Sequence, residues 1–382
     1  MYRFVIISVF FLFSLSGFAQ DLNYAKNTIN TLTSKKYWGR GYTKKGMAKT
    51  ADFIEKEFRS FGLSPMNGSD FKQHFSFSVN TFPSKMEVNL DGRKLKPGRD
   101  FIVHQASKAA IATDSLSKKD SVTYLGNSGN IVLSVQPKLT WSVSKQAADY
   151  RVIEVAKKSI IGTPKFIDVN IENEFIPNFT AANVAAMVKG TANPDSVIVF
   201  TAHYDHLGGM GNKTYFPGAN DNASGVAMLL DLAKHYAKNP PKYSVVFIAF
   251  AAEEIGLLGS KYFTENPLLP LKNIRFLWNL DLLGNGDAGA TVVNATLHPK
   301  EFALLNKINN EKKYLTKINP RGKAANSDHH FFTEKGVPAF FLYTQGGVSA
   351  YHDVDDIAKT LPLTAYEKLF RLFVEFNAHI IN

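Results

Sequence analysis

The sequence contains no cysteine among its 382 residues. This absence excludes disulfide bonds, thiolate metal ligands and a lipid anchor on a cysteine at an export-signal cleavage site. Beyond residues 4–18, no segment is apolar enough to span a bilayer. The formal net charge is +11, yet there is no arginine-rich helix and no basic strip interleaved with aromatic residues. We therefore expect a solvated basic surface and no nucleic-acid partner, with anionic substrates or envelope surfaces left open.

The N-terminal apolar run has the features of an export signal. Arg3 supplies the positive start, and Gly17-Phe18-Ala19 supplies a cleavage site of small residues. A retained membrane anchor is the alternative, but the run is short for a spanning helix. We predict a signal peptide over residues 1–19 and a mature chain that starts at Gln20, without a stable membrane anchor. Export without disulfides favours a periplasmic or secreted protein. The sequence makes no prediction of its oligomeric state.

From about residue 196, short apolar runs alternate with helical patterns. Residues 197–202, 244–251 and 274–280 are continuous runs rich in Val, Ile and Phe, which is typical of strands covered on both faces. Residues 223–238, 299–312 and 363–381 have the spacing of amphipathic helices. The alternation predicts an α/β protein, built as a three-layer α/β/α sandwich around a mostly parallel mixed sheet.

The N-terminal part is organised differently. Residues 45–61 have the pattern of a helix that Gly62 ends. Residues 81–165 instead show short strands and turn pairs such as Asp91-Gly92. We therefore predict a β-rich inserted domain over residues 81–165, and a main domain formed by residues 20–80 and 166–382.

Histidines and acids follow the predicted strands, at the carboxyl ends where ligands of such sheets gather. His203 ends the first strand, and Asp205 is placed two residues on, where it can accept a hydrogen bond from the His203 ring. Alone, this pair is more typical of an ordinary surface contact. We expect His206 to leave the strand face that carries His203, and do not count it as a ligand.

Asp221 lies in the segment Gly218-Ala-Asn-Asp-Asn-Ala-Ser-Gly225, between a glycine-bearing loop and a helix. One interpretation is a helix N-cap by Asp221 or Asn222, which is a common role for both residue types. A carboxylate can also offer one oxygen to each of two ions and hold them about 3.5 to 4 Å apart. Asp221 is therefore the predicted bridge of a two-metal site.

Glu253 and Glu254 follow the second strand directly. Adjacent acids repel each other unless a positive charge lies between them, although a solvated acidic turn is the plain alternative. Because neighbouring side chains diverge, we assign Glu254 as a metal ligand. We assign Glu253 as the general base that takes a proton from the attacking water and returns it to the leaving group.

Asp281 closes the third strand, and Tyr351-His352 brings an imidazole and a phenol near the C-terminus. Asp281 can cap the following loop, but its place beside the glutamate pair favours a metal ligand. The Tyr351 hydroxyl can donate to an oxyanion that forms during attack. Two imidazoles and several carboxylates suit two divalent ions, zinc first. The predicted metal ligands are His203, Asp221, Glu254, Asp281 and His352, and the predicted catalytic residues are Glu253, Tyr351 and Asp205.

In their order along the chain, these motifs resemble peptidase family M28, a family of zinc peptidases. The resemblance covers roughly residues 23–68 and 166–382, and includes Trp38-Gly-Arg40-Gly and Ser327-Asp328-His329. It implies that His203 and Asp281 hold one zinc and that Glu254 and His352 hold the other, with Asp221 bridging. It also implies a cis peptide bond between Asp221 and Asn222, and a supporting role for residues 327–329. The segment after His352 departs from the family pattern and keeps only an acid, Asp356, four positions on.

The resemblance implies an exported aminopeptidase that removes N-terminal residues from peptides, with two zinc ions activating the attacking water. Carboxypeptidase or dipeptidase action on the same scaffold is an alternative, and needs a cation such as Arg321 or Lys323 to hold the substrate carboxylate. Glutaminyl cyclase activity is a second alternative. A non-catalytic binding module is the last one, and it is disfavoured because no ligand of the set is missing.

Overall fold

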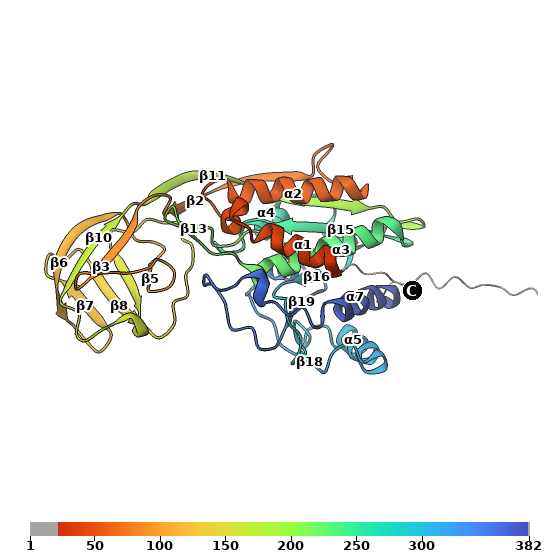
Figure 1. Ribbon diagram of the computed structural model, residues 1–382. Coiled ribbons are helices and arrows are strands. Elements are labelled where there is room, and N and C mark those ends of the chain that lie inside the picture. The colour runs from red at the N-terminus through yellow and green to blue at the C-terminus, as the bar shows by residue number, and fades with distance from the viewer. Residues whose placement is uncertain (1–21, 381–382) are drawn as a thin grey trace, which may run out of the picture.

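The computed structural model describes residues 22–380, so the predicted signal peptide and the predicted mature terminus at Gln20 lie outside the described residues. Within this range a nine-stranded mixed sheet forms the centre of the main domain, in the order β1-β11-β15-β12-β16-β19-β17-β18 with β2 beside β11 (Figure 1). The central strands β15, β12, β16 and β19 are parallel to one another. The strands of this sheet are β1 (Ser64–Pro65), β2 (Lys72–Thr81), β11 (Glu174–Val188), β12 (Asn193–His203), β15 (Tyr243–Phe250), β16 (Ile274–Leu280), β17 (Ala290–Val293), β18 (Ile318–Pro320) and β19 (Ala339–Thr344).

Helices cover both faces of this sheet because its central strands are apolar on both sides. On β12, Ile198 and Phe200 pack into the core under one helical layer, whereas Val197 and Val199 pack into the core under the other. The first layer contains α1 (Leu22–Leu32), α2 (Gly46–Phe61), α3 (Ser224–Lys238), α5 (Pro299–Lys312) and α7 (Tyr366–Ile380), and the second contains α4 (Leu258–Glu265) and α6 (His329–Glu334). The predicted three-layer α/β fold is confirmed.

The predicted elements of the main domain agree closely with the observed ones. Strand β16 and helix α5 occupy the predicted ranges, and α3 begins one residue later than predicted. Helix α2 ends as predicted, because Gly62 adopts a left-handed conformation and its amide donates to the Arg59 carbonyl. No helix within residues 22–380 combines the length and the apolar character needed to cross a membrane.

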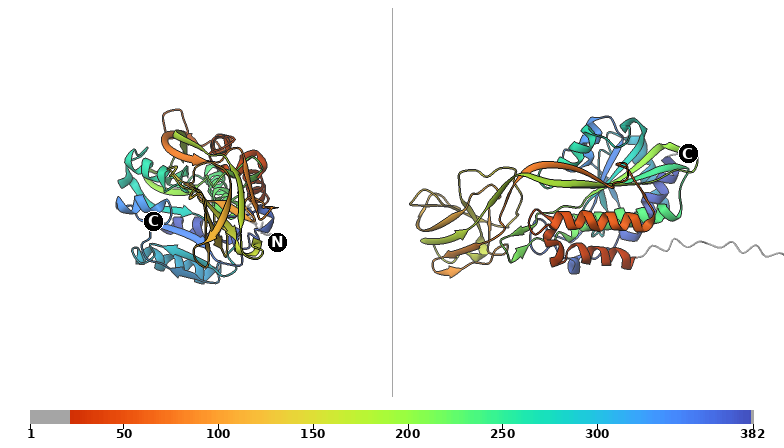
Figure 2. Two further views of the ribbon diagram at one scale, coloured as in Figure 1. Left: turned by 90° about the vertical axis from the view of Figure 1, so that its left-hand side faces the viewer. Right: turned by 90° about the horizontal axis from the view of Figure 1, so that it is seen from above.

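A second sheet of eight strands forms the inserted domain, in the order β4-β3-β10-β6-β7-β8-β9-β5. The long paired strands β2 and β11 run from the main sheet toward it (Figure 2, right). Its strands are β3 (Met86–Leu90), β4 (Arg93–Lys94), β5 (Phe101–Val103), β6 (Ala110–Lys118), β7 (Thr123–Gly126), β8 (Val132–Gln136), β9 (Val152–Ala156) and β10 (Phe166–Ile171). Strand β10 pairs with both β3 and β6, so the predicted border at residue 165 falls too early.

The inserted domain shares its core with the main domain. Leu207, Met210 and Phe216 belong to the main domain but pack into the core of the second sheet. Trp141 of the inserted domain stacks on Phe216, with ring centroids 4.7 Å apart. A short hairpin of β13 (Gly209–Met210) and β14 (Thr214–Tyr215) lies at this junction. The two units are therefore joined by side-chain packing as well as by β2 and β11.

Candidate active site

The residues predicted for the site converge at one edge of the main sheet. His203 is the last residue of β12, Glu253 and Glu254 come shortly after β15, and Asp281 directly follows β16. These three strands are parallel neighbours, so their carboxyl ends meet at the same edge. The strand order thus brings together residues that are up to 78 positions apart in the sequence, such as His203 and Asp281.

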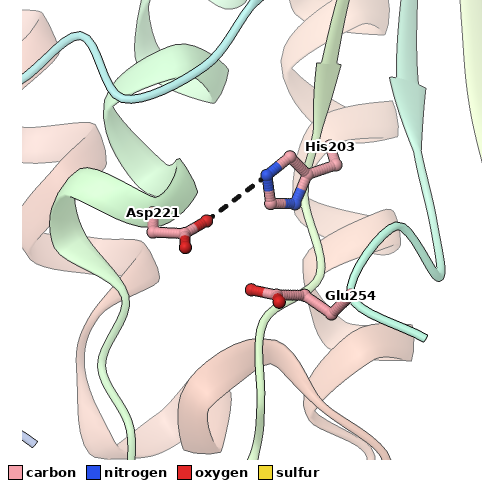
Figure 3. Close-up of side chains that lie close together, drawn as sticks. All are labelled: His203, Asp221 and Glu254. Carbon is pink, nitrogen blue, oxygen red and sulfur yellow. Dashed lines mark ion pairs between the residues drawn. The ribbon is translucent and has the colours of Figure 1, made fainter. Parts of the chain in front are cut away.

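Asp221 occupies the centre of the cluster. Its Oδ1 lies 3.4 Å from Nε2 of His203, and its Oδ2 lies 3.2 Å from Nε2 of His352. Figure 3 shows the carboxylate of Asp221 facing the ring of His203, with Glu254 beside them. The two oxygens of one carboxylate therefore face two different imidazoles, as a bridge between two ions requires. The peptide bond between Asp221 and Asn222 is cis, which confirms that expectation.

Glu254 lies on the His352 side of the cluster, and Asp281 lies on the His203 side. Oε2 of Glu254 is 3.1 Å from Nε2 of His352, and Oδ1 of Asp281 is 3.4 Å from Nε2 of His203. Ser327 donates to the second oxygen of Asp281 over 3.3 Å, so the segment 327–329 supports a ligand through its first residue. Asp221 therefore lies between two pairs, Asp281 with His203 and Glu254 with His352.

Backbone carbonyls hold both imidazoles. Nδ1 of His203 lies 3.2 Å from the carbonyl oxygen of Asp205, and Nδ1 of His352 lies 3.0 Å from the carbonyl oxygen of Trp141. A carbonyl only accepts hydrogen bonds, so Nδ1 carries a proton in each ring and Nε2 is the nitrogen that faces the carboxylates, where a metal could replace its proton. Trp141 also donates its own amide to the His352 carbonyl over 3.0 Å.

The predicted role of Asp205 is wrong in its detail. Its carboxylate lies 3.9 Å from Nδ1 of His203, too far for a hydrogen bond. It instead accepts the backbone amides of Glu253 over 3.1 Å and Glu254 over 3.4 Å. Strand β12 ends at His203, so the alternation of strand faces no longer governs the side chains that follow. Asp205 therefore orients the glutamate pair, while its main chain orients His203.

His206 lies closer to the cluster than expected for the same reason, although neither group of possible ligand atoms includes it, so its exclusion as a ligand stays a prediction. It is fully buried, and its Nδ1 lies 2.6 Å from Oε1 of Glu254. The chain has left the strand before His206, so spacing along a strand could not predict where its ring lies. His206 is a contact of the site that sequence reasoning missed, although the motif His-Tyr-Asp-His contains it.

Two buried charged groups fix the backbone that carries Asp221. The Asp356 carboxylate accepts the amides of Asn220 over 2.8 Å and Asp221 over 3.0 Å. Arg40 donates to the carbonyls of Gly218 and Asp221. Asp356, the acid four positions after His352, thus fixes the backbone on either side of Asn220 and Asp221.

The electrostatic environment of the cluster favours positive charge. Burial opposes a charged imidazole, but Glu253 and Asp281 outweigh this effect and hold the pKa of His203 well above its usual range. Burial also opposes the charged form of His352, yet Glu254 and Asp221 raise its pKa to about 11. Burial, with Asp328 and Glu254 nearby, raises the pKa of Glu253. The buried carboxylates raise the pKa of both imidazoles, whereas burial is the main cause for Glu253 and the neighbouring acids add to it.

This donor set fits divalent metal ions. His203, Asp221 and Glu254 each offer a ligand atom within 4.8 Å of the others, and so do His203, Glu253 and Asp281. Oδ1 of Asp281 is buried without a hydrogen-bond partner. Four carboxylates against two imidazoles leave negative charge that burial disfavours unless cations balance it. Glu253, the predicted base, is therefore also close enough to be a metal ligand.

The cluster forms one wall of a cavity of about 330 Å³. Tyr351 lies at this cavity and is 45% exposed, and its ring stacks on His352 at a centroid distance of 4.0 Å. Leu282, Phe341 and Tyr343 supply apolar surface, whereas Arg321 and Asn326 supply polar groups. The cavity is therefore large enough for a few residues of a ligand beside the acidic cluster.

The model of peptidase family M28 matches residues 183–377, just over half of the chain. The chain belongs to peptidase family M28. The matched M28 region contains every predicted metal ligand from His203 to His352 and leaves out the inserted domain. The resemblance based on motif order is confirmed.

Individual relatives agree with the M28 assignment. A probable zinc metalloprotease of Pyrenophora tritici-repentis is 36% identical over 156 residues, which are 39% of this chain and 35% of that protein. Aminopeptidase YwaD of Bacillus subtilis is 31% identical over 149 residues, which are 38% of this chain and 31% of that protein. The chain thus spans 21% to 35% of the length of the curated relatives it matches.

Solved structures share the fold over nearly the whole chain. An aminopeptidase from Aneurinibacillus sp. strain AM-1 has a TM-score of 0.65 at 21% identity, with 94% of each chain covered. The zinc aminopeptidase BSAP of Bacillus subtilis has a TM-score of 0.67 at 19% identity, with 93% of each chain covered. The structural likeness therefore extends over both the main domain and the inserted unit.

Proposed function

We propose that the chain is an exported metallo-aminopeptidase that binds two zinc ions and removes N-terminal residues from peptides. The arrangement around Asp221 carries the proposal, because its two oxygens face His203 and His352 separately. Family membership and the named zinc and aminopeptidase relatives support the metal and the reaction class. The apolar segment of residues 4–18 supports export.

His203 and Asp281 would hold one zinc, Glu254 and His352 the other, and Asp221 would lie between them. Zinc bound at these residues would polarise the scissile carbonyl and make the attacking water more acidic. Glu253 would then take the proton from that water and deliver it to the leaving amine. The Tyr351 hydroxyl would donate to the oxyanion, from a ring that stacking on His352 holds in place.

Replacement of Glu253 tests whether it acts as the base while Glu254 acts as a metal ligand. Glu253→Gln is expected to lower kcat by about 10² to 10⁴, since amide and carboxylate are nearly isosteric but the amide takes no proton. Zinc content, measured by mass spectrometry of the native protein, should stay at two per chain. Glu311→Gln on the exposed side of α5 is the matched control and should leave kcat unchanged. Loss of zinc from Glu253→Gln would instead indicate that Glu253 is a metal ligand.

Removal of metal and blocking of the peptide terminus test the reaction class. Chelation should abolish hydrolysis of a peptide with a free N-terminus, and zinc should restore it. The same peptide with an acetylated N-terminus should resist cleavage. Cleavage of the acetylated peptide at its C-terminus would favour the carboxypeptidase alternative, and inactivity of the zinc-loaded protein on a broad panel of peptides would reject the proposal.

A further inference from the structure

Arg321 lines the same cavity as the acidic cluster, and within residues 22–380 its guanidinium forms no ion pair. It directly follows β18, and its amide donates to the Val292 carbonyl over 2.9 Å, which anchors its backbone to β17. Its Nη1 donates to the hydroxyl of Tyr343 over 3.4 Å, and both residues line the cavity. The backbone of Arg321 is therefore fixed beside the cavity, and its exposed guanidinium has one hydrogen bond, to a neutral hydroxyl.

The neighbouring cation behaves differently. Lys323, two residues further on, forms an ion pair with Glu334 of α6. Within residues 22–380, no carboxylate oxygen lies within the 4.0 Å ion-pair distance of Arg321. Arg321 thus keeps its charge and most of its five donors available at the cavity, whereas the charge of Lys323 is balanced locally.

Charge balance at the cavity points in the same direction. Four of the lining residues are carboxylates, namely Asp221, Glu253, Glu254 and Asp281. Two divalent ions would balance these four negative charges. Arg321 is then a surplus positive charge in a cavity whose other walls include Leu282, Phe341 and Tyr343. A carboxylate entering this cavity meets a guanidinium that matches its planar geometry.

We propose that Arg321 binds a carboxylate group of the peptide substrate. This inference rests on the proposed peptidase function. The carboxylate has two chemical sources, the free C-terminus of a very short peptide or the acidic side chain of a residue beside the scissile bond. Both present the same group to Arg321. The first source makes the protein prefer dipeptides, and the second makes it prefer acidic residues.

Two pairs of substrates separate the sources. Leu-Leu and its C-terminal amide differ only in the terminal carboxylate. Glu-Leu amide and Gln-Leu amide differ only in the side-chain carboxylate. In at least one pair, the zinc-loaded protein is expected to hydrolyse the substrate that carries the carboxylate with a kcat/KM about tenfold above that of the neutral substrate. A charge-assisted hydrogen bond contributes roughly this much. The pair that shows the preference identifies the source.

Variants then assign the preference to Arg321. Arg321→Gln should remove the preference mainly through a higher KM, and should change kcat/KM of the neutral substrates less than about twofold. Arg321→Lys should keep part of it, because the charge remains but the bidentate fork is lost. Lys323→Gln, two residues away, is the matched control and should leave the preference intact. Equal loss on acid and neutral substrates, or no preference in either pair, overturns the inference while leaving the peptidase proposal standing.

Binding provides a second readout that does not need turnover. The affinities of the four compounds for Glu253→Gln are measured by calorimetry, with and without the additional change Arg321→Gln. Weaker binding of the acid alone in the double variant supports the inference. Unchanged binding of both acids overturns it. Absence of hydrolysis of all four compounds by the zinc-loaded natural protein counts against the peptidase proposal, and the binding measurement then still decides the role of Arg321.

Discussion

Arg40 is fully buried, yet its guanidinium contacts carbonyl oxygens rather than a carboxylate. It donates to the carbonyls of Tyr204, Pro217, Gly218 and Asp221 over 2.6 to 3.1 Å, and to a fifth carbonyl over 3.4 Å. Burial lowers its pKa to about 10, against the opposing effect of Asp356 and nearby acids, so it stays charged at neutral pH. The planar fork therefore joins the segment that carries Asp221 to the end of β12.

Arg40→Lys is expected to lower the free energy of unfolding by about 3 kcal/mol, because one ammonium cannot reach carbonyls on so many sides and some are left buried without a donor. Urea unfolding of the metal-free protein measures the change. Arg59→Lys is the control, since Arg59 is exposed and pairs with Glu55 on the surface of α2. Its expected cost is below about 0.5 kcal/mol. Equal effects of the two changes would mean that the network around Arg40 adds no stability.

At the scale of elements, the loop between β19 and α7 carries Tyr351 and His352 without helix or strand hydrogen bonds in residues 345–357. The inserted domain holds this loop. Trp141 exchanges two hydrogen bonds with His352, and Lys138 donates to the Ser349 carbonyl over 2.9 Å. Arg99 binds both carboxylate oxygens of Asp355 over 2.8 and 3.2 Å. The predicted metal ligand His352 is therefore held by a different sheet from the other predicted ligands.

Trp141→Phe is expected to weaken binding of the zinc that Glu254 and His352 are proposed to hold by about tenfold or more, as changes behind a ligand commonly do. The substitution removes the bond from Nε1 to the Val103 carbonyl, measured at 2.9 Å, while an aromatic ring still faces Phe216. Zinc release into a chromophoric chelator measures the effect. Trp278→Phe also loses one indole hydrogen bond, to Asn377, and is the matched control. Equal zinc release from both variants would indicate general destabilisation instead.

The sequence predicted those features that local patterns determine. The ends of β12, β15 and β16 follow from apolar runs, and parallel neighbours place His203, Glu253 and Asp281 at one edge. The contact of His206 with Glu254 was not predicted, because the chain direction after a strand depends on tertiary packing. The contact of Trp141 with His352 spans 211 residues and uses a main-chain carbonyl, so no side-chain motif could reveal it. Strand β10 extended the inserted domain for a similar reason, since its partners β3 and β6 are distant in sequence.

For the whole molecule, zinc bound at the cluster as proposed would couple folding to metal binding. Its carboxylates are buried at the junction of strands from the main sheet and a loop held by the inserted domain. Unfolding would separate these groups and release the ions, so zinc would stabilise the folded chain by mass action. At a free concentration about 1,000 times the dissociation constant, one ion contributes about 4 kcal/mol. Zinc should stabilise both the main domain and the inserted domain against unfolding, because each supplies contacts to the site.

Zinc is therefore expected to raise Tm by about 5 to 10 °C relative to the chelated protein, as followed by calorimetry. Asp281→Asn should reduce this zinc-dependent rise, because a neutral amide is a poorer ligand and one negative charge is removed from the buried cluster. In the chelated state the same change relieves repulsion among the carboxylates, so its Tm should not fall below that of the chelated natural protein. Asp287→Asn, in the loop after β16, is the control and should leave the rise unchanged. An equal loss of Tm by Asp281→Asn with and without zinc would show that Asp281 stabilises the fold independently of metal.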